Sequence, residues 1–203
     1  MRKVRISVQR ISKITALLAA LLSLTGCSNS ASGESPEDFA LSIREDFTNA
    51  ERLVVGADIT ADYGDRVYDF SVKYTGSAEA GEIRVLLPEE VAGIAAEVTL
   101  ESCVLVYDGA RLDTGALTDS GLSPAGALPA LICEWQNGRV LSIDREKLDG
   151  ADTLAISTEI GGLVSQKTWF DVITHLPVRA EISDGGRMVV TCIFSNVVVE
   201  DKL

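Results

Sequence analysis

The residue types that enzymes most often use at their active sites are sparse in this 203-residue chain. His175 is the only histidine, and no cysteine, serine or second metal ligand is spaced to work with it. The sequence contains no G-x-S-x-G, H-E-x-x-H or C-x-x-C motif and no phosphate-binding glycine loop. Glu89 and Glu90 follow Pro88 at an expected helix start, where acidic side chains favour the helix dipole. We therefore expect a non-catalytic protein with no metal and no cofactor, and we place His175 in a surface turn.

The sequence around Cys27 is more informative than the sequence around His175. Residues 1–13 carry five basic side chains and no acidic one, and an eleven-residue apolar run, residues 14–24, follows them. That run is too short to span a bilayer but has the length of a signal-peptide core. Residues 24–27 are Leu-Thr-Gly-Cys, which resembles the lipobox of bacterial lipoproteins.

The lipobox resemblance implies a covalent lipid on Cys27. In bacterial lipoproteins the cysteine thiol takes a diacylglycerol and becomes the new N-terminus, and two or three fatty chains hold it firmly on a membrane. We therefore expect the protein to be lipid-anchored on the extracytoplasmic side of the cell membrane. An ordinary secretory signal that happens to contain a cysteine is the alternative.

The charge of the chain limits what its folded part could bind. Lys and Arg number 18 against 30 Asp and Glu, a formal net charge of −12. Loss of residues 1–26 would remove five basic and no acidic residues, which leaves 13 against 30 and a net charge near −17. Nucleic acid binding requires clustered basic side chains, so we expect no nucleic-acid partner. The excess of carboxylates would keep an exported domain soluble and repel its body from anionic lipid.

The composition predicts three parts in the chain. Residues 1–26 are the expected lipoprotein signal peptide, and residues 27–35 the lipidated cysteine with a flexible tether rich in Ser and Gly. Residues 36–203 are long enough for one domain with a substantial core.

Three cysteines remain in the predicted domain, namely Cys103, Cys133 and Cys192. An odd number does not complete a disulfide framework, and a domain of this size does not need one. We expect buried free thiols, with a single Cys103–Cys192 bridge between neighbouring strands as the alternative.

Hydrophobic periodicity predicts two helices among many strands. One helix should begin at Ser35-Pro36 and run to about residue 52, and the other should occupy residues 124–137. Elsewhere apolar side chains alternate with polar ones, as in a strand with one buried face. The ten expected strands cover residues 53–62, 66–75, 79–87, 97–107, 111–113, 139–144, 153–160, 166–172, 177–183 and 187–199.

These elements predict a mainly β (α+β) fold. Short turns make the strands antiparallel, and one-sided apolar faces favour a single curved sheet that forms an open half-barrel closed by the two helices. Aromatic and aliphatic side chains would then line a ligand cavity or simply form the core. The candidates for such a cavity are Tyr68, Phe70, Val72, Tyr74, Trp135 and Phe170.

The C-terminal third resembles the LolA/LolB-like superfamily. Residues 169–179, 182–186 and 189–196 follow its ending, in which a strand, Asp, Thr-x-Leu-Pro, a strand, Asp-Gly and a last strand succeed one another. The order of helices and strands agrees over most of residues 36–199. The resemblance implies an open half-barrel with an apolar cavity. That superfamily includes periplasmic lipoprotein carriers, outer-membrane receptors and lipoproteins of Gram-positive bacteria such as the GerS-like germination lipoproteins, which act through a protein partner.

Two functions follow from this resemblance. In the first, the domain is a scaffold that binds a protein of the cell envelope or spore. In the second, its cavity holds an acyl chain or a lipidated protein, as a carrier or receptor would. A receptor would present an exposed apolar loop to lipid, whereas residues 112–122 and 144–153 are mostly acidic and small. We therefore favour the scaffold.

We expect Cys27→Ala to leave the precursor unprocessed or to release the protein from the membrane fraction, because the atom that takes the lipid is gone. Inhibition of the lipoprotein signal peptidase should leave a precursor that is heavier by the 26-residue signal. Membrane fractionation and immunoblotting measure both effects, with Cys103→Ala as the matched control. A cleaved Cys27→Ala variant that stays on the membrane would contradict the lipobox prediction.

Overall fold

The computed structural model describes residues 35–77, 79–99, 102–115 and 121–201. The predicted signal peptide, Cys27 and nearly all of the tether lie outside these residues and stay predictions. No helix among the described residues is long and apolar enough to cross a membrane.

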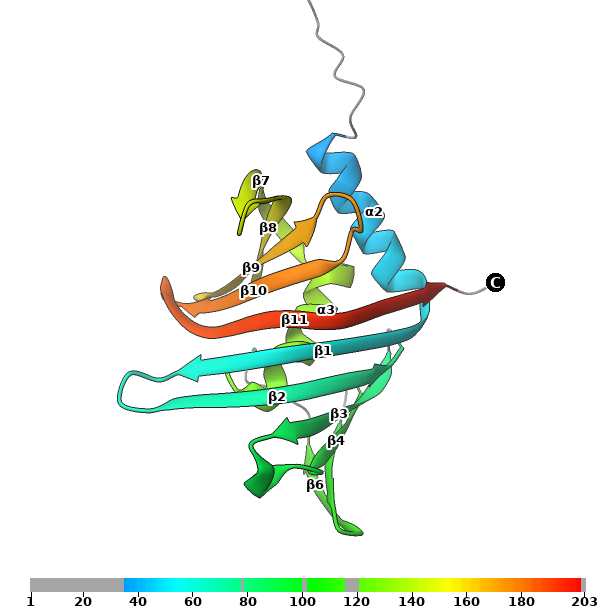
Figure 1. The fold of residues 1–203 in the computed structure, drawn as a ribbon, viewed down its shortest axis with the longest axis vertical. Helices are drawn as coiled ribbons and strands as arrows, with labels where there is room; N and C mark the ends of the chain where they lie inside the picture. The colour runs from blue at the N-terminus through cyan, green and yellow to red at the C-terminus, as the bar shows by residue number, and fades with distance from the viewer. Residues whose placement is uncertain (1–34, 78, 100–101, 116–120, 202–203) are drawn as a thin grey trace, which may run out of the picture. The chain divides into compact units, whose positions relative to one another are not determined.

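The described chain folds around one antiparallel sheet of eleven strands (Figure 1). Strands β1 and β11 lie at its centre, and β6 and β7 form its two open edges. In spatial order the strands are β6 (Ala110–Gly115), β5 (Cys103–Tyr107), β4 (Ala95–Thr99), β3 (Ala80–Leu87), β2 (Val67–Gly76), β1 (Ala50–Asp62), β11 (Arg187–Asp201), β10 (Pro177–Asp184), β9 (Val164–Asp171), β8 (Ala151–Gly161) and β7 (Arg139–Leu148).

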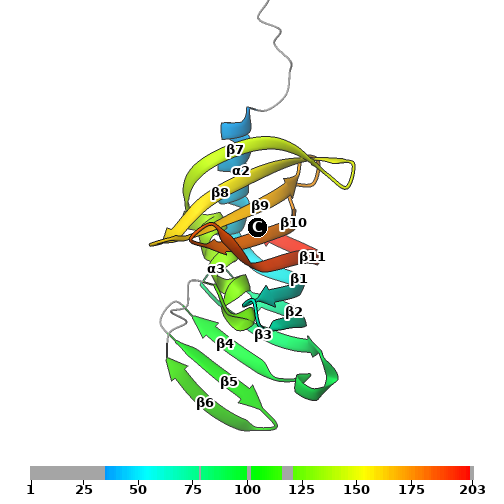
Figure 2. The same ribbon diagram turned by 90° about the vertical axis from the view of Figure 1, so that its left-hand side faces the viewer.

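Two helices pack on the concave side of this sheet (Figure 2). They are α2 (Pro36–Asn49) and α3 (Pro124–Asn137), and a short 3-10 helix, η2 (Glu89–Val91), follows β3. An open sheet with two helices on its inner face is the predicted fold class, which is confirmed.

Helix α2 begins where the sequence predicts and ends earlier. The Ser35 hydroxyl accepts a hydrogen bond from Asp38 N at 3.1 Å, which satisfies one of the free N–H groups of the first turn. The helix ends at Asn49 rather than near residue 52 because the backbone from Ala50 onward pairs with β11. Ladder hydrogen bonds therefore replace the last predicted turn.

Helix α3 has the predicted bounds. The Ser123 hydroxyl caps it by accepting from Gly126 N at 3.1 Å, and Pro129 is accommodated inside the helix. Its predicted apolar stripe is buried against the sheet and α2. The buried residues of this stripe are Leu128, Leu131, Ile132 and Trp135.

One predicted strand was wrong in its extent. The chain over 97–107 is not a single strand but the end of β4 followed by β5, two paired neighbours. The two strands are antiparallel, and Thr99 N donates to Ser102 O at 2.9 Å. No Gly or Pro stands between Thr99 and Ser102 to indicate in the sequence that the strand ends there. The sheet therefore has eleven strands instead of about ten.

The core lies between the two helices and the inner face of the sheet. The Phe47 ring of α2 is fully buried and lies 4.9 Å from the ring of Trp135. Trp135 also meets Phe170 of β9 at 5.9 Å and Phe194 of β11 at 5.4 Å, both edge-on. Rings from four elements thus meet at Trp135, so this cluster fixes both helices on the sheet.

The three cysteines of the domain are free, as expected. The alternative Cys103–Cys192 bridge was wrong, because β4, β3, β2 and β1 lie between their strands in the sheet. Cys103 and Cys192 are buried, whereas Cys133 is partly exposed rather than buried. Burial raises the pKa of the Cys192 thiol to about 12.

We expect iodoacetamide to label Cys133 first and to reach Cys103 and Cys192 only in denaturant. The thiolate is the nucleophile, and burial keeps the Cys192 thiol both neutral and inaccessible. Mass spectrometry of the alkylated peptides with and without denaturant gives the order. Fast labelling of Cys192 in the folded protein would show that the centre of the sheet is more open than this structure.

We expect Phe47→Ala to lower the free energy of unfolding by about 3–5 kcal/mol, the usual cost of removing a buried phenyl ring. Leu41→Ala is the matched control, because Leu41 lies on the same helix with 56% of its surface exposed. Its effect should stay within about 0.5 kcal/mol. Urea denaturation followed by tryptophan fluorescence measures both; equal losses would place the core elsewhere.

Candidate functional site

The six predicted cavity residues do not share one hollow. Trp135, Phe170, Val72 and Tyr74 are buried core residues, and Phe70 is partly buried against that core. Tyr68 has 39% of its surface exposed and meets Tyr63 near the β1–β2 turn. Their role in ligand binding stays a prediction.

The hollows found beside α3 are small. One of about 60 Å³ lies between α3 and strands β2–β4, where Tyr74, Ile132 and Cys133 contribute to its wall. Another of about 20 Å³ lies between α2, α3 and strands β7–β9, beside Trp135 and Phe170. Binding sites for small molecules usually measure about 300–1,000 Å³. In the described part of the chain, side chains of α3 thus pack in the core on the concave face, where the sequence predicts a possible ligand cavity.

Buried polar side chains hold α3 in that position. Trp135 donates its indole N–H to Thr168 at 3.0 Å, and Thr168 in turn donates to Gln166. Gln166 donates to Thr158 at 3.0 Å, and Thr158 donates to Glu134 of α3 at 2.7 Å. The chain of bonds leaves α3, crosses β9 and β8, and returns to α3. A buried network whose members are all paired fixes one arrangement of its elements.

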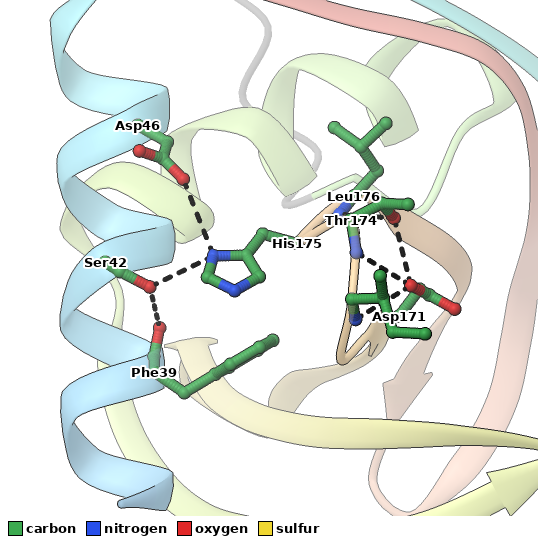
Figure 3. Close-up of polar contacts among 8 residues, drawn as sticks. Phe39, Ser42, Asp46, Asp171, Thr174, His175 and Leu176 are labelled. Carbon is green, nitrogen blue, oxygen red and sulfur yellow. Dashed lines mark hydrogen bonds and ion pairs between the residues drawn. The ribbon is translucent and has the colours of Figure 1, made fainter. Parts of the chain in front are cut away.

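The single histidine lies in the turn between β9 and β10, beside α2 (Figure 3). His175 has a positive φ of 60°, and its ring lies 4.6 Å from the ring of Phe39. Its Nδ1 lies 3.3 Å from the Ser42 hydroxyl and 4.0 Å from an Asp46 carboxylate oxygen. The imidazole therefore packs the turn against α2.

Asp171 organises the same turn from within. Its carboxylate accepts from Ile173 N at 2.9 Å, from Thr174 N at 2.8 Å and from the Thr174 hydroxyl at 3.1 Å. Thr174 also bonds to the backbone of the turn, since its hydroxyl accepts from Leu176 N at 3.4 Å. The bonds that Asp171 accepts, with that from Thr174 N foremost, hold the pKa of Asp171 below its usual range. This contribution to stability is present at neutral pH and is lost as the pH falls through the folded-state pKa. The contacts are structural.

Two larger hollows lie on the outer face of the sheet. Outward side chains of β1, β2 and β11 surround one of about 400 Å³, which we call the central groove; Gly56, Lys73 and Val198 lie along it. The other, of about 610 Å³, lies over β1, β2 and the β3–η2 connection. The two share Asp58 and Ser71 and so adjoin each other.

We call the second hollow the acidic groove. Its walls carry the carboxylates of Asp58, Asp69, Glu89 and Glu90, and no Lys, Arg or His lines it. Two of these carboxylates accept hydrogen bonds from neutral hydroxyls. Thr60 donates to Asp69 at 2.6 Å, and Ser71 donates to Asp58.

Sequence reasoning missed both outer grooves. Their position depends on the register that sets Asp58 opposite Ser71 and Thr60 opposite Asp69 across β1 and β2. Side chains alternate along β2, so the sequence pattern places Asp69 and Ser71 on its polar face. The pattern does not tell which residues of β1 lie beside them. Gly56 lets β11 approach closely beside the central groove, since a Cβ there would lie 2.7 Å from Ser195 O.

The described residues offer little for catalysis. No group of three or more His, Cys, Asp and Glu side chains is placed to hold a metal ion within the described ranges. His175 meets a serine hydroxyl and a carboxylate, but Ser42 donates to the Phe39 carbonyl within its own helix.

Comparison with known proteins adds information on the fold. No family model and no curated protein matches the chain. Among solved structures, a domain of Vibrio parahaemolyticus named as an outer membrane lipoprotein-sorting protein matches at 12% identity with a TM-score of 0.51, over 83% of this chain and 95% of that one. An uncharacterised conserved protein of Thermus thermophilus matches at 8% identity with a TM-score of 0.50, over 83% and 90%.

A weaker match comes from the complex between the CwlD amidase and the GerS lipoprotein of Clostridioides difficile. It has 12% identity and a TM-score of 0.39, over 100% of this chain and 98% of that one, and a score this low supports no argument. The first two matches and the open sheet with its two inner helices agree with each other: the described chain has the LolA-like half-barrel fold.

Proposed function

We propose that this protein is a lipid-anchored lipoprotein of the cell envelope whose half-barrel binds a protein partner and catalyses no reaction. The partner belongs to the envelope or to the layers of a spore. The anchor part of this proposal rests on the lipobox-like residues 24–27, and the binding part rests on the folded domain.

The observation that carries the proposal is the position of α3. Trp135 and the bonded chain from Thr168 to Glu134 seat this helix in the concavity, where the hollows found beside it measure about 60 and 20 Å³. Hollows of binding-site size, about 400 and 610 Å³, open instead on the outer face. A surface of that kind suits a macromolecule better than a buried acyl chain.

The charge of the chain indicates the kind of partner. The sequence has 30 acidic residues against 18 basic ones, and four of the carboxylates gather in the acidic groove. Complementary potentials speed the encounter of two proteins and exclude partners of like charge. The partner should therefore carry a basic patch.

We expect the soluble domain, residues 28–203, to capture a protein from its own host that is released as salt is raised. Salt screens exposed charges beyond about 10 Å at 0.1 M, so a charge-dependent contact should weaken several-fold between low and high salt. Pull-down at two salt concentrations measures this. Native mass spectrometry of the same preparation tests the alternative carrier function.

The two functions give opposite results in this experiment. A carrier would hold a stoichiometric acyl ligand, and its affinity would follow buried apolar area and respond little to salt. A stoichiometric acyl ligand together with the absence of a salt-sensitive protein would therefore replace the scaffold proposal with the carrier.

A further inference from the structure

We infer that the acidic groove is the docking site of the partner, and that it takes an extended segment with lysine or arginine beside apolar side chains. This inference rests on the proposed function and adds the place of contact and the chemistry of the segment. It concerns the outer face of β1 and β2 and the β3–η2 connection.

Uncompensated charge is the first observation behind this inference. Within the described part of the chain, no Lys, Arg or His forms an ion pair with Asp58, Asp69, Glu89 or Glu90. Several carboxylates on other strands of the same sheet do have such partners. Examples are Glu97 with Arg111 at 2.6 Å and Glu146 with Lys167 at 2.6 Å.

The hydrogen bonds of the two strand carboxylates leave their charge in place. Asp69 accepts from Thr60 and Asp58 accepts from Ser71, so both donors are neutral. These bonds hold the carboxylate groups in position on the face of the sheet. A guanidinium or ammonium group entering the groove would meet acceptors that are already oriented.

The groove also has an apolar part. Leu87 has 51% of its surface exposed at the rim, and Pro88 lies next to it in the lining. Lysine and arginine carry long aliphatic stems that pack on apolar surface while the charged head reaches polar groups. A cationic side chain, or a cationic one next to a leucine-like one, therefore fits both the carboxylates and the apolar lining.

The adjoining central groove indicates an extended occupant. It continues from Asp58 and Ser71 along β1 and β11 past Gly56, where the backbone of Ser195 approaches closely. Arg52 and Lys73 stand along it with Asp58 and Glu200, and Arg52 pairs with Glu200, so the charges of this groove balance while those of the acidic groove do not. The segment should lie along both grooves, with its basic residues in the acidic one.

The test uses the full-length chain in nonionic detergent and a fluorescein-labelled peptide of alternating lysine and leucine residues. The groove variant combines Asp58→Asn, Asp69→Asn, Glu89→Gln and Glu90→Gln. The control variant combines Glu45→Gln, Glu51→Gln, Asp144→Asn and Asp149→Asn, which neutralises as many exposed carboxylates away from both grooves. The two variants thus have equal net charge.

We expect the groove variant to bind the peptide at least about ten-fold more weakly than the parent, and the control variant to lose less than about two-fold. Fluorescence anisotropy gives the dissociation constants, and circular dichroism verifies that both variants fold. Should the groove variant fail to fold, Glu89→Gln with Glu90→Gln alone, outside the strands, should still weaken binding several-fold. Equal losses in the two variants, unchanged binding in both, or no binding to the parent would each overturn the inference.

The salt-dependent pull-down separates this inference from the proposed function. If the groove variant captures the same salt-sensitive host protein as the parent does, the docking site lies elsewhere while the scaffold function stands. If the parent captures no salt-sensitive protein, the scaffold function itself fails.

Discussion

Trp135 packs its indole ring among Phe47, Phe170 and Phe194, and donates its N–H to Thr168 at the bottom of the concave face. An open sheet of eleven strands exposes a large apolar face unless another element covers it. Helix α3 supplies this cover, and Trp135 is the residue through which α2, β9 and β11 all meet it. The position of both helices on β9 and β11 depends on that contact.

The same contact holds α3 against the concave face of the sheet. A half-barrel that kept its concavity open would place a ligand inside, against the residues that now surround Trp135. Here the polar chain through Thr168, Gln166 and Thr158 ends on Glu134 of α3, so moving the helix would leave buried polar groups without partners. Opening the interior would therefore cost these hydrogen bonds.

Much of the fold could be predicted because its signals are local. Ser35 and Ser123 cap the helices, and the alternation of Tyr68, Phe70, Val72 and Tyr74 marks one face of β2. The order of strands in a sheet depends on contacts between residues far apart in the sequence. The sequence alone therefore did not exclude a Cys103–Cys192 bridge. The six proposed cavity residues all lie on inward faces of their elements. Which of them are buried depends on where α3 packs, and Tyr74 is buried whereas Tyr68 is exposed.

The outer grooves were beyond prediction for a related reason. Each carboxylate of the acidic groove lies on an element that the sequence indicates, yet the groove exists only because β1 and β2 pair in one register and η2 follows β3 beside them. Surface carboxylates on β strands are usually interpreted as a solvated face, and most of the pairs on this sheet fit that interpretation. In the acidic groove, Thr60 and Ser71, rather than lysine or arginine, donate to Asp69 and Asp58. A protein that leaves four carboxylates without cationic partners beside an exposed leucine bears a cost in mutual repulsion, and a cationic partner would remove that cost on binding.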